Sequence, residues 1–137
     1  MYYSDSGEAL KKFNTRDGMG IEMLSQKNID TILITRENSK IVKQRAKKLK
    51  IKKSYYGVNK KELLLDKICS LYAIKPYQIA YIGDDVNDVE IMKLVGFSGT
   101  PMDGTKSVKK IANYICKSKG GEGAFREFAE VILEKKI

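Results

Sequence analysis

The stretch that decides the fold is Ile79–Asp88, which reads Ile-Ala-Tyr-Ile-Gly-Asp-Asp-Val-Asn-Asp. Its first four residues suit a buried strand, and the acidic residues after Gly83 crowd the start of the helix that follows. Open α/β sheets bind their ligands at this edge, where strands end and helices begin. The stretch therefore predicts a functional site at Asp84, Asp85 and Asp88.

These three carboxylates lie so close together that they repel one another and need a positive partner. A hard divalent cation with oxygen ligands answers that need, and we expect Mg²⁺. An alternative is a capped helix, because Asp and Asn are good caps and acidic residues suit a first helical turn. A cap accounts for one or two of these residues, so the pattern favours a metal site at Asp84, Asp85 and Asp88.

The composition predicts one globular domain over residues 1–137, because 42% of the residues are hydrophobic and can form a core. The sequence contains no apolar run long enough to span a bilayer and does not start with a signal peptide, so a cytoplasmic protein without a membrane partner is expected. Cys69 and Cys116 lack metal-ligand spacing. We expect both to be buried small hydrophobic residues in a reducing compartment.

The formal charge of +9 invites a nucleic-acid interpretation. The lysines, however, are spread over every predicted helix in short runs such as Lys47-Lys48 and Lys109-Lys110. A solvated basic surface and an anionic small substrate explain them better, so no nucleic-acid partner is expected. The sequence contains no histidine, which excludes Ser-His and Cys-His nucleophile pairs and His-ligated zinc.

Strands and helices alternate along the sequence. A hairpin is predicted over residues 1–13, with an irregular N-terminus as the alternative, and Asn14, Thr15 or Asp17 can cap the helix that follows. Further strands are predicted over residues 31–35, 51–56, 79–82, 97–100 and 113–116. Helices are predicted over residues 15–28, 40–49, 61–72, 88–95, 105–111 and 124–133.

This alternation is typical of an α/β fold, with a parallel sheet covered on both faces and right-handed crossovers. The carboxyl ends of parallel strands gather along one edge of the sheet. Thr35, residues 57–61 and the acidic residues 84–88 would then lie together.

Five motifs in order resemble the haloacid dehalogenase superfamily. They are Phe13-Asn14-Thr15-Arg16-Asp17-Gly18, then Thr35, then Gly57-Val58 with Lys61, then Gly83–Asp88, then Gly120–Glu127. Within the superfamily, the chain looks like the capless sugar-acid phosphatases that act on KDO 8-phosphate. It also resembles the phosphatase-like domain of acylneuraminate cytidylyltransferases.

The resemblance implies a Rossmann-like three-layer sandwich without a cap domain and a magnesium-assisted phosphoryl transfer through an aspartyl-phosphate. By position, Thr35 would hydrogen-bond the phosphoryl oxygens and Lys61 would neutralise their charge. Asp84 would ligate Mg²⁺, with Asp85 and Asp88 steadying its shell.

The resemblance also suggests substrate contacts and a homotetramer. Glu37, Arg45 and Lys48 resemble positions that contact the sugar in the branch acting on nine-carbon sialic-type acids, so an acylneuraminate 9-phosphate is a second possible substrate type. For Arg45 and Lys48 a solvated helix face is the alternative. Gly120–Gly123 and Arg126 would reach a neighbouring subunit's active site, for which a flexible linker to a packing helix is the alternative.

One departure from the family is large. Family members begin with a strand that is central to the sheet and ends in Asp-x-Asp-Gly, whose first aspartate is the nucleophile, and this sequence contains no such motif. A second departure is Arg36-Glu37, where many members carry Gly-Arg. Either the natural protein begins upstream or the chain is a non-hydrolytic relic, and in both cases we expect it to be inactive or nearly so as given. The alternative function is a non-catalytic oligomerisation domain of the cytidylyltransferase type.

Overall fold

The computed structural model describes the backbone of residues 2–4, 7–10 and 14–135 and the side chains of residues 14–135. The strands are β1 (Tyr2–Ser4), β2 (Gly7–Leu10), β3 (Ile32–Ile34), β4 (Lys53–Tyr55), β5 (Ala80–Ile82), β6 (Phe97–Thr100) and β7 (Tyr114–Ile115). The α-helices are α1 (Thr15–Ser25), α2 (Lys40–Lys48), α3 (Leu65–Tyr72), α4 (Val89–Leu94), α5 (Lys106–Ile111) and α6 (Ala124–Lys135). Three short 3₁₀ helices are η1 (Lys61–Leu64), η2 (Pro76–Gln78) and η3 (Val86–Asp88).

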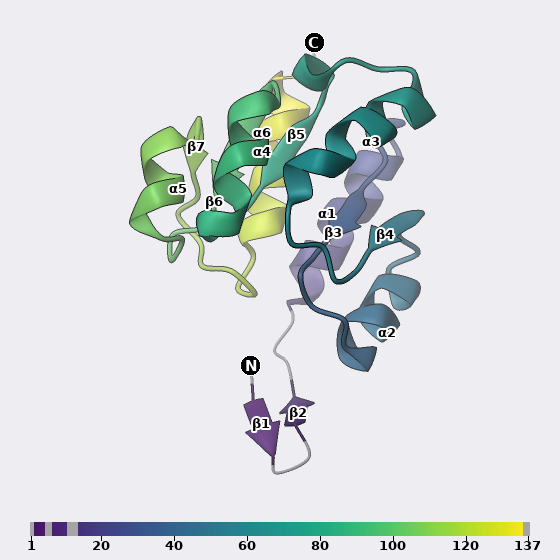
Figure 1. Ribbon diagram of the computed structural model, residues 1–137, viewed down its shortest axis with the longest axis vertical. Coiled ribbons are helices and arrows are strands. Elements are labelled where there is room, and N and C mark those ends of the chain that lie inside the picture. The colour runs from purple at the N-terminus through teal and green to yellow at the C-terminus, as the bar shows by residue number, and fades with distance from the viewer. Residues whose placement is uncertain (1, 5–6, 11–13, 136–137) are drawn as a thin grey trace.

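The fold is α/β with parallel strands, as the sequence predicts. Strands β3 and β4 form one parallel sheet, and β5, β6 and β7 form a second in that order. In Figure 1, α1 and α6 lie behind these strands and α3 and α4 lie in front of them. The result is three layers, with the carboxyl ends of β3, β4, β5 and β6 available to form a site.

Two half-sheets stand where one sheet is predicted. Strands β3 and β5 are each paired on one side only among the described residues, and Figure 1 shows them as the neighbouring ends of the two sheets. Neither strand has a buried residue, and Ala80 in β5 is exposed, whereas Ser98 and Thr100 in β6 are buried. Residues 31–35 and 79–82 do contain strands, but the prediction that these strands are buried is wrong. Inner strands of a parallel sheet are buried only when both of their edges are paired.

Helices join the two half-sheets. Helix α1 packs closely against α6, where a Cβ atom on Gly20 would lie 3.2 Å from Cα of Arg126. The Asp17 carboxylate accepts a hydrogen bond from the backbone N–H of Arg126 at 3.0 Å. Asp17 therefore caps the start of α6, while Asn14 caps α1 by accepting from the N–H of Arg16.

The densest core lies under α6. Cys116, Ala124 and Phe128 are buried there together, and the ring of Phe128 stacks on Phe97 with 5.5 Å between centroids. Cys116 is a buried free cysteine, as expected. Cys69 is also free but only half-buried, so the expectation of burial is wrong for this residue.

Other elements differ in detail from the sequence predictions. The hairpin returns through β2 earlier than expected, and residues 11–13 lie outside the described residues. In α3, Leu65 and Ile68 are buried while Leu71 is 53% exposed, because Leu71 lies at the border of the buried face. Among the described residues, no helix is both long and apolar enough to cross a membrane.

Candidate functional site

Asp88 is the centre of the candidate site. The residue is 1% exposed, and both carboxylate oxygens have partners. Oδ1 accepts from Lys61 Nζ at 2.7 Å and from the Tyr81 hydroxyl at 2.5 Å. Oδ2 accepts from the backbone N–H groups of Asp84 at 2.9 Å and Asp85 at 3.2 Å. One carboxylate therefore holds together η1, β5 and the turn after β5.

The environment keeps Asp88 ionised. Burial by itself would raise the pKa of this carboxyl, but the hydrogen bonds from Lys61 and Tyr81 and the charge of Lys61 outweigh burial and lower it. Lys61 is only 8% exposed, so this ion pair is largely shielded from water. A lysine that the sequence alone presents as one of many surface cations is thus a buried group with a fixed position.

Gly83 allows Asp88 to fold back under the turn. A Cβ atom on Gly83 would lie 2.5 Å from both Cβ and Cγ of Asp88, which is closer than any real contact. The glycine is therefore required by close approach of the Asp88 side chain and not by its own backbone angles. This explains why a glycine follows β5 at the start of the acidic turn.

Tyr81 belongs to the site, although its sequence context indicates only a residue of a buried strand. Its hydroxyl donates to Asp88, and burial followed by the charge of Asp88 raises its pKa far above the ordinary value. The neutral phenol is therefore a permanent donor. The available signal was its place in β5, two residues before Gly83 on a strand that ends at the acidic turn.

Asp84 and Asp85 project into solvent from the turn that Asp88 anchors. Partial burial and then the negative charge of Asp88 raise the pKa of Asp84. The negative charge of the ionised Asp84 carboxylate is therefore not fully balanced by nearby positive charge. Asp85 caps η3, since its carboxylate accepts from the N–H of Val86 at 2.6 Å. A cation beside Asp84 would supply the missing positive charge, so the donor chemistry of this turn fits a hard cation.

The three aspartates do not share one role. Asp88 has both oxygens occupied, so it supports the turn and is not placed as a direct ligand. Among the described residues, no group of three or more His, Cys, Asp or Glu side chains could hold a metal ion by itself. One supporting carboxylate beneath two outward ones is compatible with Asp84 as the metal ligand and Asp85 and Asp88 as its support, and this assignment stays a prediction.

Backbone hydrogen bonds connect Thr35 to the loop that carries Lys61. The Thr35 carbonyl accepts from Val58 N–H at 2.9 Å, and the Glu37 carbonyl accepts from Gly57 N–H at 3.2 Å. Gly57 has φ +66°, the left-handed region that favours glycine. The structure thus joins the ends of β3 and β4 directly and joins β4 to Asp88 through Lys61. These bonds bring residues 35, 57–61 and 84–88 together at one edge, as predicted.

The predicted substrate residues lie elsewhere or point to other partners. Arg45 donates from Nη2 to the Asn14 carbonyl at 3.2 Å, and the exposed Lys48 lines the groove between α1 and α2. Arg126 at the start of α6 forms an ion pair with Glu130 at 2.9 Å. Glu37 follows Thr35 at the end of β3, so of this set it is nearest in sequence to the residues that the edge brings together.

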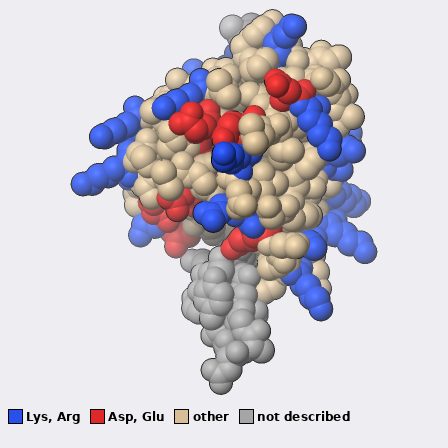
Figure 2. Space-filling model, in the orientation of Figure 1, with Lys and Arg blue, Asp and Glu red and all other residues tan. Residues whose placement is uncertain are grey.

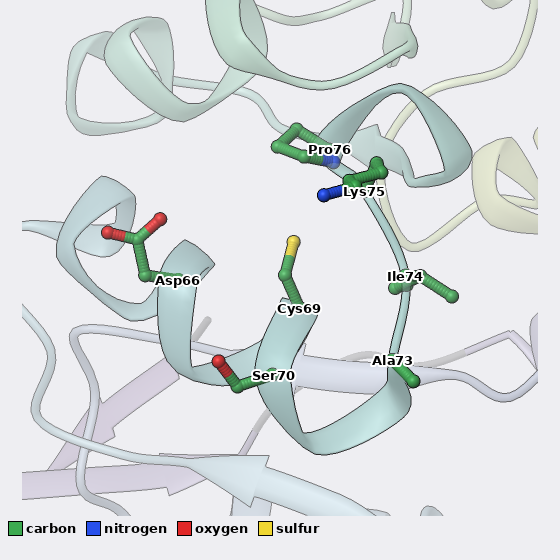
Figure 3. A pocket seen from close by; sticks show the side chains of 7 residues that line it. All are labelled: Asp66, Cys69, Ser70, Ala73, Ile74, Lys75 and Pro76. Atoms are coloured by element: carbon green, nitrogen blue, oxygen red, sulfur yellow. The ribbon is translucent and has the colours of Figure 1, made fainter.

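Two surface hollows lie away from this site. One of about 560 Å³ lies between α3 and the segment before η2, and Figure 3 shows the Cys69 thiol pointing into it from α3. The other, of about 470 Å³, includes Asp30 and Thr31 before β3 and Lys52 before β4. Residues that precede parallel strands lie at the amino edge, opposite the edge that holds Asp84 and Thr35. Neither hollow includes Lys61 or Asp88.

Basic side chains do not gather on the face seen in Figure 2. Lysine and arginine residues are scattered around its outline, and acidic groups lie between them. This distribution resembles a solvated surface more than a continuous track for a phosphate backbone.

Comparison with known proteins identifies the family of this chain. The sequence pattern of haloacid dehalogenase-like hydrolases matches residues 27–128, which include Thr35, Lys61 and the acidic turn. The chain belongs to this family. Its membership accounts for the parallel α/β fold.

Relatives within the haloacid dehalogenase family act on a sugar-acid phosphate. The 3-deoxy-D-manno-octulosonate 8-phosphate phosphatase of Yersinia pestis is 38% identical over 133 residues, which are 97% of this chain and 71% of that protein. The corresponding phosphatase of Haemophilus influenzae, solved in a cobalt-bound form, superposes with a TM-score of 0.92 at 34% identity. That match covers 97% of this chain and 78% of the other.

A third relative was solved with ligands. The phosphatase of Moraxella catarrhalis, in complex with a magnesium ion, a phosphate ion and KDO, has a TM-score of 0.91 at 33% identity. It covers 97% of this chain and 76% of the other. Because these superpositions include nearly the whole chain, the two half-sheets keep the relative placement that the matching elements have in these family members.

Proposed function

We propose that this chain carries the metal-binding and phosphate-binding half of a magnesium-dependent phosphatase that hydrolyses a keto-deoxy sugar acid phosphate of the KDO 8-phosphate type. The observation that carries the proposal is the buried Lys61–Asp88 pair, which holds the Asp84 turn at the carboxyl edge of the parallel strands. The names and bound ligands of the relatives support the substrate class and the cation.

The roles of the residues follow from their surroundings. Asp84, with Asp85 beside it, would hold Mg²⁺, which supplies charge neutralisation for the phosphate when it is bound. Lys61 presents an ammonium whose position Asp88 and the η1 backbone define. Thr35 lies at the end of β3, where its hydroxyl accepts from the N–H of Glu37 and can turn its own proton toward a phosphoryl oxygen.

The proposal includes inactivity of the polypeptide as given. Phosphoryl transfer through an aspartyl-phosphate needs a carboxylate nucleophile, and the sequence has no Asp-x-Asp-Gly to supply one. Within the described part of the chain, strands β3 and β5 have unpaired edges next to each other, and a strand ending in that motif would deliver its carboxylate between Thr35 and Asp84. We also propose a homotetramer, which light scattering after gel filtration can test.

The test measures phosphate release from KDO 8-phosphate and from N-acetylneuraminate 9-phosphate with Mg²⁺ present. We expect no turnover by the 137-residue polypeptide. Turnover of KDO 8-phosphate should appear when an apolar strand ending in Asp-x-Asp-Gly is fused ahead of residue 1, and it should be lost in the same fusion with the first aspartate changed to asparagine.

Three results would contradict the proposal. Robust turnover by the unextended polypeptide would refute the need for an added nucleophile. Preference for the nine-carbon substrate would refute the substrate class. A fused protein that forms a stable oligomer yet releases no phosphate would favour the non-catalytic oligomerisation domain.

A further inference from the structure

The Glu127 carboxylate on α6 collects hydrogen bonds from outside its own helix. Oε2 accepts from the Tyr114 hydroxyl at 2.5 Å and from Lys117 N–H at 2.9 Å, and Oε1 accepts from Ser118 N–H at 3.0 Å. Burial alone would raise the pKa of Glu127, but these donors, led by Tyr114, lower it. The carboxylate thereby holds the chain just after β7 against the start of α6.

The segment that Glu127 holds is bonded in turn to the loop after β6. Met102 N–H donates to the Ser118 carbonyl at 2.9 Å, and Gly120 N–H donates to Asp103 Oδ1 at 2.9 Å. Two loops that are separate in sequence are thus linked at two points. Because Gly121 and Gly123 have φ +72° and +101°, the glycine-rich chain can reverse here before α6 begins.

The loop after β6 reaches the candidate metal site. Thr105 N–H donates to the carbonyl of Asp84 at 3.0 Å, which ties this loop to the acidic turn. Gly104 packs closely against Thr100 at the end of β6, since a Cβ atom on Gly104 would lie 2.1 Å from the Thr100 hydroxyl oxygen. Hydrogen bonds therefore link Glu127 to Ser118 and Ser118 to Met102. The chain of residues 102–105 leads on to Thr105, which is hydrogen-bonded to Asp84.

We propose that Glu127 is a positioning residue that holds the loops after β7 and β6 together and, through Thr105, sets the backbone position of Asp84. The part of this inference that concerns metal binding rests on the proposed function, whereas the coupling of the two loops does not. Glu127 touches neither Lys61 nor Asp88, so it would act only through the loops.

The experiment compares Glu127→Gln with Glu130→Gln by amide hydrogen exchange. Glutamine keeps the shape of the side chain but places an NH₂ donor where one carboxylate oxygen accepts. Because Tyr114 donates to Oε2 and Ser118 to Oε1, these two bonds cannot both form in the variant. Glu130 lies about one turn along the same helix and forms an ion pair with Arg126 of that helix, which makes it the matched control. Tyr114→Phe removes a single donor and serves as a milder variant.

In Glu127→Gln we expect exchange to become roughly tenfold faster at Lys117 and Ser118, and also at Met102, Gly120 and Thr105, which corresponds to about 1.4 kcal/mol in the opening equilibrium. Amides of α3 should keep their protection, and Glu130→Gln should match the wild type. Tyr114→Phe should give a smaller change at the same five amides. A change confined to Lys117 and Ser118, or one spread equally over all helices, would overturn the proposal.

A second measurement separates this inference from the proposed function. We expect Mg²⁺ to shift the amide signal of Asp84 at severalfold higher concentration in Glu127→Gln than in Glu130→Gln. If Mg²⁺ left the wild-type signal unchanged, the proposed function would fail, and the exchange data would still decide the coupling. If Mg²⁺ bound equally to both variants, Glu127 would not position Asp84.

Discussion

At the scale of single residues, the site depends on one buried ion pair. Lys61 and Asp88 are almost removed from water, and the pair is completed by Tyr81 and two backbone N–H groups. Removing one partner from such a pair leaves an uncompensated charge, which costs more than the pair contributes. The stability of the fold and the geometry of the site are therefore coupled at this point.

We expect Lys61→Met to lower the free energy of unfolding by about 3–5 kcal/mol, because the Asp88 charge stays buried without its cation. Urea unfolding at neutral pH measures this. Lys60→Met changes the adjacent, exposed lysine and should cost little. Adding Asp88→Asn to Lys61→Met should recover part of the loss, and a lower stability in the double variant would contradict the assignment.

The pH dependence of Asp88 has a definite sign. Its pKa is lowered in the folded state, so the folded protein binds fewer protons than the unfolded chain. Its contribution is complete above the unfolded value of about 3.9 and is lost as the pH falls through the lower folded value. We expect Lys61→Met to remove this acid-induced loss, which unfolding curves recorded between neutral and strongly acidic pH will show.

Asp84 should behave in the opposite way. Its pKa is raised in the folded state, so its ionised form opposes folding at neutral pH. We expect Asp84→Asn to raise the urea midpoint at pH 7 by a small amount that disappears as the pH falls below the raised pKa. Mg²⁺ should stabilise the wild type but not this variant. Asp66→Asn on the exposed face of α3 is the control, and an equal gain there would contradict the prediction.

At the scale of elements, caps and close contacts decide how helices meet. Asn14 and Ser39 cap α1 and α2 within their own turns, but Asp17 caps α6 across the molecule. This last contact joins helices 109 positions apart in sequence. It turns a local capping preference into a tertiary restraint between α1 and α6.

We expect Asp17→Ala to lower the free energy of unfolding by about 1 kcal/mol, the usual cost of a lost cap, and to speed amide exchange at Arg126. Glu22→Ala on an exposed position of α1 should do neither. If exchange at Arg126 stayed as slow as in the wild type while α1 itself frayed, Asp17 would be acting on its own helix.

At the scale of the whole molecule, two parallel half-sheets are held in one frame by helices on both faces. Their inner strands β3 and β5 are less buried than β6, the reverse of what a completed parallel sheet requires. The frame nevertheless superposes on solved phosphatases over 97% of the chain. The acidic turn and Lys61 are positioned by the helical layers and by the Asp88 pair, without a strand between β3 and β5 in the described residues.

We expect an apolar strand fused ahead of residue 1 to raise the free energy of unfolding by several kcal/mol, because it would bury apolar area on β3 and β5 and pair their edges. Amides of Leu33 and Tyr81 should become protected from exchange. The same fusion with a central proline is the control, since proline cannot donate to a ladder. Unchanged exchange in β3 and β5 would contradict the prediction.

The sequence by itself determined the order of the elements, the α/β class and the residues of the edge site. Local rules are enough for these, since alternation of short apolar runs, caps and glycines identifies strands, helices and turns. The resemblance added roles for Thr35, Lys61 and Asp84, which stay predictions, and the family match confirms the family itself.

Only the tertiary structure decided how these residues work together. Asp88 lies buried beneath the acidic turn, Tyr81 and Glu127 take part in hydrogen-bond networks that no spacing indicates, and Arg45 donates to Asn14. The incomplete burial of β3 and β5 was likewise invisible in their apolar sequences. The reason is that burial and hydrogen-bond partners depend on which segments meet in space, and residues far apart in sequence supply them.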